Sequence, residues 1–503
     1  MTNLEKYYEY QRELKNYEYA LFVLSYDEET DCPRLAKAHS LEVFQYFENK
    51  YYDITLCKNY EDTLFALEND SSLDKLVALS IKKECKNLHK LKKLPKDLFN
   101  NHLKNLANTG LLWEEARESL DYSKFESALV ELVSYNKKYI EIEETKDIFG
   151  YNVLLDEMEE GSSEEMYDEF FSLIEKRLVP FIQKIIKMPK KFNTKLLDIK
   201  FPISKQRELT EMIIKKMGYS NDVGCIRETI HPFTAGVYNK DIRITTSYDE
   251  SLLLSNLYSI MHETGHALYE LQNDDALNNT SLRGGASMAL HESQSRFYEN
   301  YVGRNYHFIK ALYPILKDIF KEELKDISLD DLYYYANNVE ASLIRTEADE
   351  LTYPIHILIR YKIEKMLFHN EILVKDIDRV FNELMEKYLG IKPKNKKEGC
   401  YQDIHWSSGF GYFPTYAFGS AIAAQIYYKM QEDINFNKAL ENMDFKEINL
   451  WLKDKIHKYG ASLTPKELII NATGEEFNPN YYLKYLISKF SKIYEVSYED
   501  WFA

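Results

Sequence analysis

The sequence predicts a mainly α-helical protein that contains one small β-ribbon. Glycine and proline, which interrupt helices, number only 17 and 12 in 503 residues, about half of the roughly 12 % share that they have in average proteins. Apolar residues recur at helical spacing along most of the chain, and the alternation typical of strands is confined to residues 225–248. Long helices with a single short sheet follow from these patterns.

The N-terminal part is predicted to form successive amphipathic helices over residues 3–51 and 60–145, whose apolar faces pack together. The stretch "KLKKLPKD" (90–97) is expected to be a solvated charge run with a proline break. A helix is expected to start within "GSSEEMYDEF" (161–170), where a serine precedes glutamate. Helices resume at residue 250 and continue to the C-terminus, with "KPKNKKEG" (392–399) as a loop.

The expected ribbon has two strands, "CIRETI" (225–230) and "DIRITTSY" (241–248), both rich in β-branched residues. In the second strand Ile242 and Ile244 share one side, and Arg243 and Thr245 share the other. The intervening "HPFTAGVYNK" carries proline, glycine and asparagine, so it is expected to connect the two strands.

Composition excludes some classes of protein. A net charge of −17 argues against a general nucleic-acid binder, because phosphate affinity comes from clustered lysine and arginine. Five widely spaced cysteines without a CxxC pair fit reduced thiols better than disulfides. The N-terminus lacks a secretory signal pattern, and no apolar run approaches the ~18 residues that span a bilayer. We therefore expect a soluble cytoplasmic protein that binds neither nucleic acid nor membrane.

The stretch "MHETGHALYE" (261–270) places His262 and His266 one helical turn apart, so both imidazoles project from the same side of a helix. Two histidines in this arrangement can bind one tetrahedral zinc ion at roughly 2.0–2.1 Å. Glu263 follows the first histidine, where it can take a proton from a water whose pKa the metal lowers to about 7. Two surface histidines on a polar stripe are the simpler alternative.

A catalytic zinc site usually has three protein ligands and a water, so a third ligand is expected. Glu292, within "MALHESQSRFYEN" (288–300), is the favoured candidate, because an antiparallel return of the chain can bring its carboxylate to the metal. His291 and Glu299 are competing candidates nearby. Glu270, one turn past His266, is either the acceptor of that histidine's second ring proton or an exposed helix acid.

Several stretches together resemble one family, the carboxypeptidase Taq family of metallocarboxypeptidases. They are "HPF" (231–233), "DIRIT" (241–245), "HETGH" (262–266), "HESQ" (291–294), "IRTEAD" (344–349), "GCYQDIHW" (399–406) and "GYFPTY" (411–416). The likeness extends to "LSYDEET" (24–30), with Tyr26 where the family commonly has tryptophan, and it covers nearly the whole chain.

The resemblance implies a single domain over residues 1–503, in which helical lobes flank a deep active-site cleft and residues from about 225 to 420 form the metal-site core. It implies a metallocarboxypeptidase that releases single amino acids from the free C-terminus of peptides. His262, His266 and Glu292 would hold one divalent ion, Zn²⁺ or alternatively Co²⁺, and Glu263 would be the general base. The resemblance also implies a homodimer.

A carboxypeptidase needs a group that binds the terminal carboxylate of its substrate. Arginine fits best, because its planar guanidinium group pairs with a carboxylate through two hydrogen bonds. Arg345 is the first candidate, with Gln402 and His405 as neighbours in the same subsite. The structural alternative is a buried ion pair of Arg345 with Glu347, Asp349 or another acid.

The remaining motif residues have open roles. Arg243, with Asp241, either contacts substrate from an edge strand or only stabilises the ribbon. His231 contacts substrate or is structural. Tyr412 and Tyr416 are candidates for a second donor to the oxyanion, Tyr412 being assigned to catalysis and Tyr416 to substrate binding.

Two rival functions would use these features differently. An endopeptidase or oligopeptidase on a similar helical scaffold would need the metal but no group for a terminal carboxylate. A non-catalytic helical peptide-binding protein would have no use for Glu263 beside two metal ligands. A purely structural zinc site usually closes with a fourth protein ligand, and no cysteine lies near residues 262–292.

Overall fold

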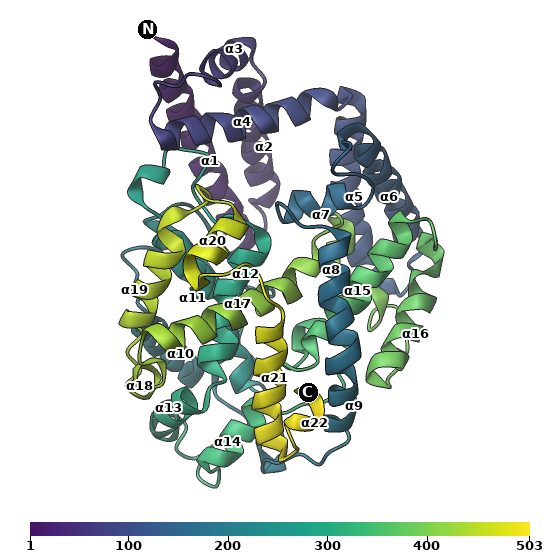
Figure 1. Ribbon diagram of the computed structural model, residues 1–503, viewed down its shortest axis with the longest axis vertical. Coiled ribbons are helices and arrows are strands. Elements are labelled where there is room, and N and C mark those ends of the chain that lie inside the picture. Colours follow the sequence, from purple (N-terminus) through teal and green to yellow (C-terminus); the bar gives the residue numbers. More distant parts are fainter. Residues whose placement is uncertain (503) are drawn as a thin grey trace. The chain divides into compact units, whose positions relative to one another are not determined.

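The computed structural model describes residues 1–502, which form many helices (Figure 1) and one three-stranded sheet. The predicted mainly helical fold is confirmed. The residues group into two compact units, each assembled from three separate stretches of the chain. Unit 1 comprises Met1–His89, Asn193–Ala336 and Ile426–Phe477, and unit 2 comprises Lys90–Phe192, Asn337–Gln425 and the residues from Asn478 onward. The single domain, its cleft and the extent of the metal-site core stay predictions.

Unit 1 contains the N-terminal helices, the sheet and the helices that follow the sheet. Its elements are α1 (Asn3–Glu29), α2 (Lys37–Thr55), α3 (Lys58–Leu67), α4 (Lys75–Lys93), η2 (Thr194–Asp198), α10 (Ile203–Met217), β1 (Ile226–Glu228), β2 (Thr234–Tyr238), β3 (Asp241–Thr246), α11 (Leu253–Leu271), η3 (Asp275–Leu277), α12 (Met288–Arg296), η4 (Phe297–Gly303), α13 (Tyr306–Ile319), α14 (Leu329–Ala336), α18 (Phe436–Glu441), α19 (Lys446–Lys455), η9 (His457–Tyr459) and α20 (Pro465–Thr473).

Unit 2 consists of helices and connecting loops, and its described residues contain no strand. Its elements are α5 (Lys96–Ser119), α6 (Ser123–Glu143), α7 (Asn152–Met158), α8 (Glu164–Leu173), η1 (Ile174–Leu178), α9 (Val179–Ile185), η5 (Arg345–Glu347), α15 (Tyr353–Phe368), η6 (Val374–Asp376), α16 (Ile377–Leu389), η7 (Cys400–Gln402), η8 (Ile404–Ser407), α21 (Asn480–Tyr494) and α22 (Glu499–Phe502). Two helices have residues in both units: α17 (Phe413–Asp433) and α4, whose residues from Lys90 onward belong to unit 2.

The helix boundaries follow local sequence signals. Helix α1 starts after Thr2, whose hydroxyl accepts a hydrogen bond from the Glu5 amide at 3.1 Å. Helix α4 ends and α5 begins around Pro95, so the proline break in the charge run is confirmed. Helix α8 starts after Ser163, whose hydroxyl caps the Met166 amide, as the serine before glutamate predicts. Residues 392–399 form a loop, as predicted.

The sheet differs from the predicted two-stranded ribbon. The strand order is β1-β3-β2, with β1 parallel and β2 antiparallel to β3. The segment 231–240, expected to be only a connection, therefore contains the third strand, and the prediction was wrong on this point. Strand β2 can lie this close to β3 because Gly236 has no side chain: a Cβ there would lie 2.4 Å from Cδ1 of Ile242. Ile242 and Ile244 are fully buried, as their shared side predicts.

Helix α11 is the central element of unit 1. It contacts α10, α12, β2 and β3, and most of its side chains are buried. Gly265 allows α12 to approach closely, because a Cβ at this position would lie 2.8 Å from the Gln294 carbonyl oxygen and from Cα of Ser295. The glycine between the two histidines of α11 thus determines how near α12 can lie.

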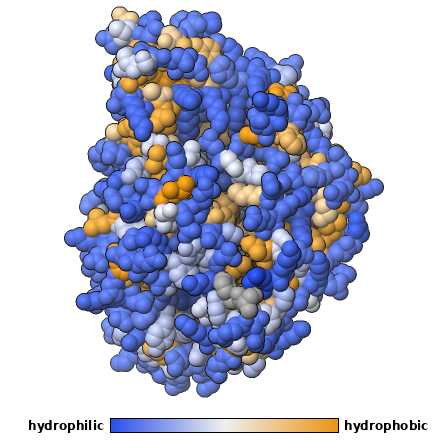
Figure 2. Space-filling view, in the orientation of Figure 1, coloured by the Kyte–Doolittle hydropathy of each residue, from blue (hydrophilic) through white to orange (hydrophobic). Residues whose placement is uncertain are grey.

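The surface agrees with the acidic, charged composition. Figure 2 shows hydrophilic residues over most of the visible face, with apolar side chains in small separate groups. All five cysteines are free thiols. Among residues 1–502, none of the helices has both the length and the apolar character that crossing a membrane requires.

Candidate active site

The three predicted metal ligands meet within unit 1. Nε2 of His262 lies 3.7 Å from Oε2 of Glu292, and Nε2 of His266 lies 3.5 Å from the same oxygen. Atoms bound tetrahedrally at about 2.1 Å lie about 3.4 Å apart, so this spacing suits a single ion. The two imidazoles are 18 % and 17 % exposed, which rules out the alternative of a pair of surface histidines.

This cluster is distinctive within the part of the chain that the structure describes. His262, His266 and Glu292 form the one group of at least three His, Cys, Asp or Glu residues whose ligand atoms lie within 4.8 Å of one another. Helix α11 supplies both histidines and α12 supplies the glutamate. The close approach at Gly265 brings the two helices together at this point.

The outer nitrogen of each ligand imidazole has its own hydrogen-bond partner. Nδ1 of His262 lies 2.9 Å from Oε2 of Glu299, and Nδ1 of His266 lies 2.6 Å from Nδ1 of His291. Both Nε2 atoms are therefore directed toward Glu292. His291 and Glu299, the competing candidates for third ligand, contact the two histidines instead.

Both alternatives for Glu270 were wrong. Its carboxylate is 12 % exposed and accepts hydrogen bonds from Nε2 of His291 at 2.9 Å and from Arg283 at 3.0 Å. It therefore reaches His266 only through His291. Helical spacing places Glu270 near His266, but the ring of His291 from α12 lies between them.

The charge states of Glu292, Glu299 and His266 suit a divalent cation, whereas burial would lower the pKa of His262 but Glu292 and Glu299 raise it above its ordinary value. Burial alone would raise the pKa of Glu292, but Arg296, whose Nε donates to Oε1 at 2.7 Å, and the two histidines hold it below its ordinary value. Burial would also raise the pKa of Glu299, yet Arg296 and His262 hold it at about 2. Burial lowers the pKa of His266 to about 3, which keeps this imidazole neutral. A neutral imidazole and an ionised carboxylate are the forms that bind metal.

Glu263 is buried beside these groups, with 7 % exposure. The hydroxyl of Thr234, on β2, lies 2.7 Å from Oε2 of Glu263 and 2.9 Å from its main-chain oxygen. Burial raises the pKa of Glu263, as a general base requires. Sequence analysis missed Thr234, although it directly follows "HPF"; the strand that carries it was taken for a connection.

Arg345 lies in a buried arginine cluster of unit 2, which we define as Arg345, Arg360 and Asp403. Nε and Nη2 of Arg345 lie 2.8 and 2.7 Å from Oδ1 of Asp403, while Nε of Arg360 donates to Oδ2 at 2.6 Å. The ion pair left open as the structural alternative is therefore present, with Asp403 as the acid. Both arginines hold the pKa of Asp403 well below its ordinary value against the effect of burial.

The other predicted residues of unit 2 lie around Arg345. Nε2 of His405 is 2.9 Å from the Tyr416 hydroxyl, and the Tyr416 ring lies 5.0 Å from the guanidinium group of Arg345. The Tyr412 ring stacks on His405 with centroids 5.5 Å apart. Oε1 of Gln402 accepts from the Arg345 amide at 2.6 Å, and its Nε2 donates to main-chain carbonyls. Burial and Arg345 lower the pKa of His405 to about 4.

Comparison with known proteins decides the family. A sequence profile described as carboxypeptidase Taq (M32) metallopeptidase matches residues 6–490. The chain belongs to this family. Carboxypeptidase 1 of Bacillus subtilis (strain 168) is 36 % identical over 498 residues, which cover 98 % of this chain and 99 % of that protein. Thermostable carboxypeptidase 1 of Pyrococcus furiosus is 38 % identical over 391 residues, or 75 % of this chain and 76 % of that protein.

Solved structures agree with the sequence relatives. The M32 carboxypeptidase from Deinococcus radiodurans R1 matches with a TM-score of 0.94 at 29 % identity, over 99 % of this chain and 100 % of that chain. The Pyrococcus furiosus carboxypeptidase matches with a TM-score of 0.92 at 31 % identity, over 97 % and 99 %. The resemblance seen in the sequence is confirmed, and this M32 chain is a metal-dependent carboxypeptidase.

Arg243 and His231, two residues predicted to contact substrate, lie in unit 1. Nε and Nη2 of Arg243 each lie 2.9 Å from an oxygen of Asp241, and the guanidinium group lies over Phe22 and Tyr26. These contacts agree with the second alternative given above for Arg243, namely that it stabilises the sheet. His231 is exposed in the connection between β1 and β2. A substrate-binding role for either residue stays a prediction.

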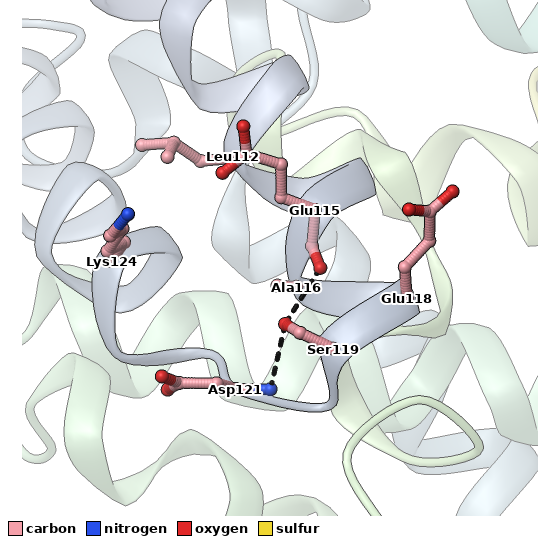
Figure 3. Close-up of a pocket in the computed structure, with 7 residues that line it drawn as sticks. All are labelled: Leu112, Glu115, Ala116, Glu118, Ser119, Asp121 and Lys124. Carbon is pink, nitrogen blue, oxygen red and sulfur yellow. Dashed lines mark hydrogen bonds between the residues drawn. The ribbon is translucent and has the colours of Figure 1, made fainter.

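A surface pocket of about 560 Å³ lies between the end of α5 and the start of α6 (Figure 3). It is lined by residues from 112 to 124 and includes none of the predicted site residues. Ser119 donates to the Glu115 carbonyl oxygen at 2.8 Å and accepts from the Asp121 amide at 3.3 Å. These hydrogen bonds belong to the end of α5, and the pocket has no part in the M32 site described above.

Proposed function

We propose that this chain releases single amino acids from the free C-terminus of peptides, with one divalent ion, Zn²⁺ or Co²⁺, held by His262, His266 and Glu292. The observation that carries the proposal is the set of three donor atoms within 4.8 Å of one another, next to the buried Glu263. Two imidazoles and one carboxylate are a donor set of catalytic zinc sites, which keep one position for water or substrate.

An ion held by these three residues would supply Lewis acidity, which would polarise the scissile carbonyl group and lower the pKa of water. Glu263 accepts the proton of the attacking water and passes it to the leaving amine. Thr234 lies 2.7 Å from Oε2 of Glu263, so Oε1 is the oxygen that moves the proton. Glu299 orients His262 through its Nδ1 at 2.9 Å, which keeps Nε2 of that imidazole directed at the ion.

Arg345 binds the terminal carboxylate of the peptide in this proposal. In the arginine cluster two guanidinium groups share the single carboxylate of Asp403. One positive charge of this buried group is therefore balanced by no acid within the cluster, and a substrate carboxylate can balance it. Asp403 also fixes the orientation of the guanidinium plane, because it binds two of its nitrogens.

His405, Tyr416 and Tyr412 complete the proposed substrate site. The hydrogen bond of His405 to Tyr416 and its stacking on Tyr412 make the three rings one cluster beside Arg345. We assign His405 and Tyr416 to substrate binding and Tyr412 to the oxyanion. Gln402 acts through Arg345, whose main-chain amide it binds at 2.6 Å.

The proposed enzyme is cytoplasmic and forms a homodimer. Five free thiols suit a reducing compartment, which supports the location. The homodimer rests on the family resemblance alone. Cell fractionation tests the first statement, and size-exclusion chromatography with light scattering tests the second; a mass of one chain in solution would contradict the dimer.

The test of the activity uses one unmodified peptide and its C-terminally amidated twin. Each is incubated with the purified protein and Zn²⁺, Co²⁺ or a chelator, and the products are read by mass spectrometry. We expect a ladder of single-residue losses from the unmodified peptide alone, abolished by the chelator. Internal fragments from both peptides would assign an endopeptidase instead, and a metal-loaded protein that cleaves neither peptide would contradict the proposal.

A further inference from the structure

The Nδ1 atoms of the two ligand histidines of α11 have different hydrogen-bond partners. Nδ1 of His262 meets a carboxylate, Glu299, at 2.9 Å, as metal-bound histidines commonly do. Nδ1 of His266 meets a second imidazole, that of His291, at 2.6 Å. This second arrangement is extended by a carboxylate and a guanidinium group, so His266 is the first member of a chain of four side chains.

The hydrogen atoms of this chain have one consistent arrangement. If Nε2 of His266 binds a metal, the ring proton must be on Nδ1, which then donates to Nδ1 of His291. Nδ1 of His291 is thereby an acceptor, so its proton is on Nε2, which lies 2.9 Å from Oε1 of Glu270. Arg283 donates to Oε2 of Glu270 at 3.0 Å and to the Gly236 carbonyl at 2.8 Å. Each donor that joins one of these side chains to the next therefore has an acceptor, from His266 to the edge of the sheet, while Nε of Arg283 has no hydrogen-bond partner among the described residues.

Packing restricts the movement of these four hydrogen-bonded side chains. The side chains of His291, Glu270 and Arg283 are 24 %, 12 % and 8 % exposed. The backbone of Gly285 lies so close that a Cβ there would be 2.6 Å from Cδ2 of His291. A bulkier residue at position 285 would therefore displace a ring whose two nitrogens are both engaged.

His291 cannot replace Glu292 as a ligand in this arrangement. The two residues are consecutive on α12, so their side chains point about 100° apart around the helix. Both ring nitrogens of His291 have partners away from Glu292, in His266 and Glu270. The role that the geometry leaves to His291 is support of His266.

We propose that His291 and Glu270 are positioning residues that fix the tautomer and the ring orientation of His266, and thereby strengthen divalent-metal binding. The inference rests on the proposed metal centre at His262, His266 and Glu292. It deepens that proposal, because it assigns a role to two residues that bind neither metal nor substrate. Loss of a supporting partner of this kind typically weakens metal binding about 10- to 100-fold.

The test measures the dissociation constant of Zn²⁺ by competition with a chromogenic chelator, for the full chain and five variants, one of which is the ligand variant His266→Ala. His291→Ala is expected to weaken Zn²⁺ binding about 10- to 100-fold. His291→Asn is expected to recover part of that loss, because its amide oxygen can accept the Nδ1 proton of His266. Gly285→Ala is expected to weaken binding without removing any hydrogen-bonding group. His307→Ala is the matched control, since His307 pairs with Glu441 elsewhere in unit 1.

Two further readouts separate positioning from folding. Thermal unfolding of the metal-free proteins is expected to give similar midpoints for His291→Asn and the unchanged chain. The visible absorption of the Co²⁺ forms is expected to shift in His291→Ala and Gly285→Ala but not in His307→Ala, because the ligand field depends on the orientation of the His266 ring.

The outcomes distinguish this inference from the proposed metal centre. His266→Ala serves as the reference: if it binds Zn²⁺ as tightly as the unchanged chain, the metal centre itself is wrong. If His266→Ala loses binding while His291→Ala stays within twofold of the unchanged chain, only the positioning role is overturned. A loss in His291→Ala that asparagine does not reduce would also overturn it, since ring volume rather than hydrogen bonding would then matter.

Discussion

The metal centre of unit 1 and the arginine cluster of unit 2 are both buried and contain many charged groups, but acidic groups are in excess in the first and basic groups in the second. Around the metal ligands, carboxylates outnumber guanidinium groups: Glu263, Glu270, Glu292 and Glu299 lie among Arg283, Arg296 and Arg304. In the cluster, Arg345 and Arg360 share Asp403. An excess of carboxylates favours binding of a cation and an excess of guanidinium groups favours binding of an anion, which agrees with the proposed metal ion and the proposed peptide carboxylate.

Another buried carboxylate, that of Glu364, shows what decides whether a buried acid is ionised. Glu364 of unit 2 is fully buried and accepts hydrogen bonds from Tyr151 and the Gly411 amide, and within the described part of the chain no arginine pairs with it. Burial raises its pKa to about 7. Glu292 and Asp403 are buried too, yet their neighbouring arginines hold their pKa values low. Arginine contact, rather than depth, keeps a carboxylate ionised here.

The largest expected effect is at the metal centre, from Glu263→Gln. The amide cannot accept a proton, so kcat should fall about 10²- to 10⁴-fold while the metal stays bound. Turnover of a free-C-terminus peptide and the zinc content of the same sample check this. A metal-loaded variant that keeps more than a tenth of the turnover would remove Glu263 from the role of base.

In the arginine cluster, Asp403→Asn should destabilise the chain by about 3–5 kcal/mol, because two buried guanidinium groups then lack their shared counter-charge. Urea unfolding measures this loss. Arg345→Gln is the matched variant: Arg360 still balances Asp403, so stability should fall less, while KM for free-C-terminus peptides rises. Equal losses of stability in both variants would contradict the charge balance described for the cluster.

Glu364→Gln tests how the raised pKa of this buried carboxyl group affects stability at different pH values. Its folded-state pKa of about 7 lies above the ordinary value of 4.5, so the folded chain holds more protons between these values. The contribution of Glu364 to stability is therefore fully present below pH ~4.5 and is lost as pH rises through ~7, by about 3 kcal/mol. Urea unfolding at pH 4.5, 6 and 8 should show this loss in the unchanged chain and not in the variant. Parallel profiles would contradict the raised pKa.

Gly265→Ala tests whether helix approach builds the metal centre. The added methyl group would meet the backbone of α12 at 2.8 Å, which should cost about 1–3 kcal/mol in stability and weaken Zn²⁺ binding as Glu292 moves. Gly110→Ala is the control, because among the described residues no atom outside the adjacent backbone of its own helix lies within 4 Å of a Cβ there, and the stability of the chain should rise by about 0.4–1 kcal/mol. Unchanged Zn²⁺ affinity in Gly265→Ala would show that α12 adjusts without moving the ligand.

The smallest expected effect is that of Thr234→Val. Loss of a hydrogen bond to a charged group, worth about 1.5 kcal/mol, should lower kcat about tenfold with the metal content unchanged. Thr234→Ser keeps the hydroxyl and should restore most of the rate. Equal rates in the valine and serine variants would mean that the hydroxyl does not orient Glu263.

Several features could be read from the sequence because they depend on local spacing. The helices, their caps at Thr2 and Ser163 and the break at Pro95 follow from neighbouring residues. The pairing of His262 with His266 follows from the helical repeat. Glu292 was selected from three candidates with help from the family resemblance, and the structure brings it to the two histidines.

Other features depend on partners far apart in the chain. The third strand forms because residues 234–238 pair with β3, although their own sequence suggests a turn. Arg345 meets Asp403, 58 positions away, rather than the acids beside it in "IRTEAD". The hydrogen bonds that connect His266 through His291 to Glu270 require α11, α12 and the close approach of Gly285 to the His291 ring.

The sequence by itself determined the helical class, the family and the residue types of a metal centre, because periodicity and motif spacing are properties of neighbouring residues. The tertiary structure alone decided which carboxylates are ionised, which donors face each ligand and which strand carries Thr234. Those outcomes depend on burial and on contacts between elements, and the close approach of α12 to Gly265 is not encoded in the spacing of either helix.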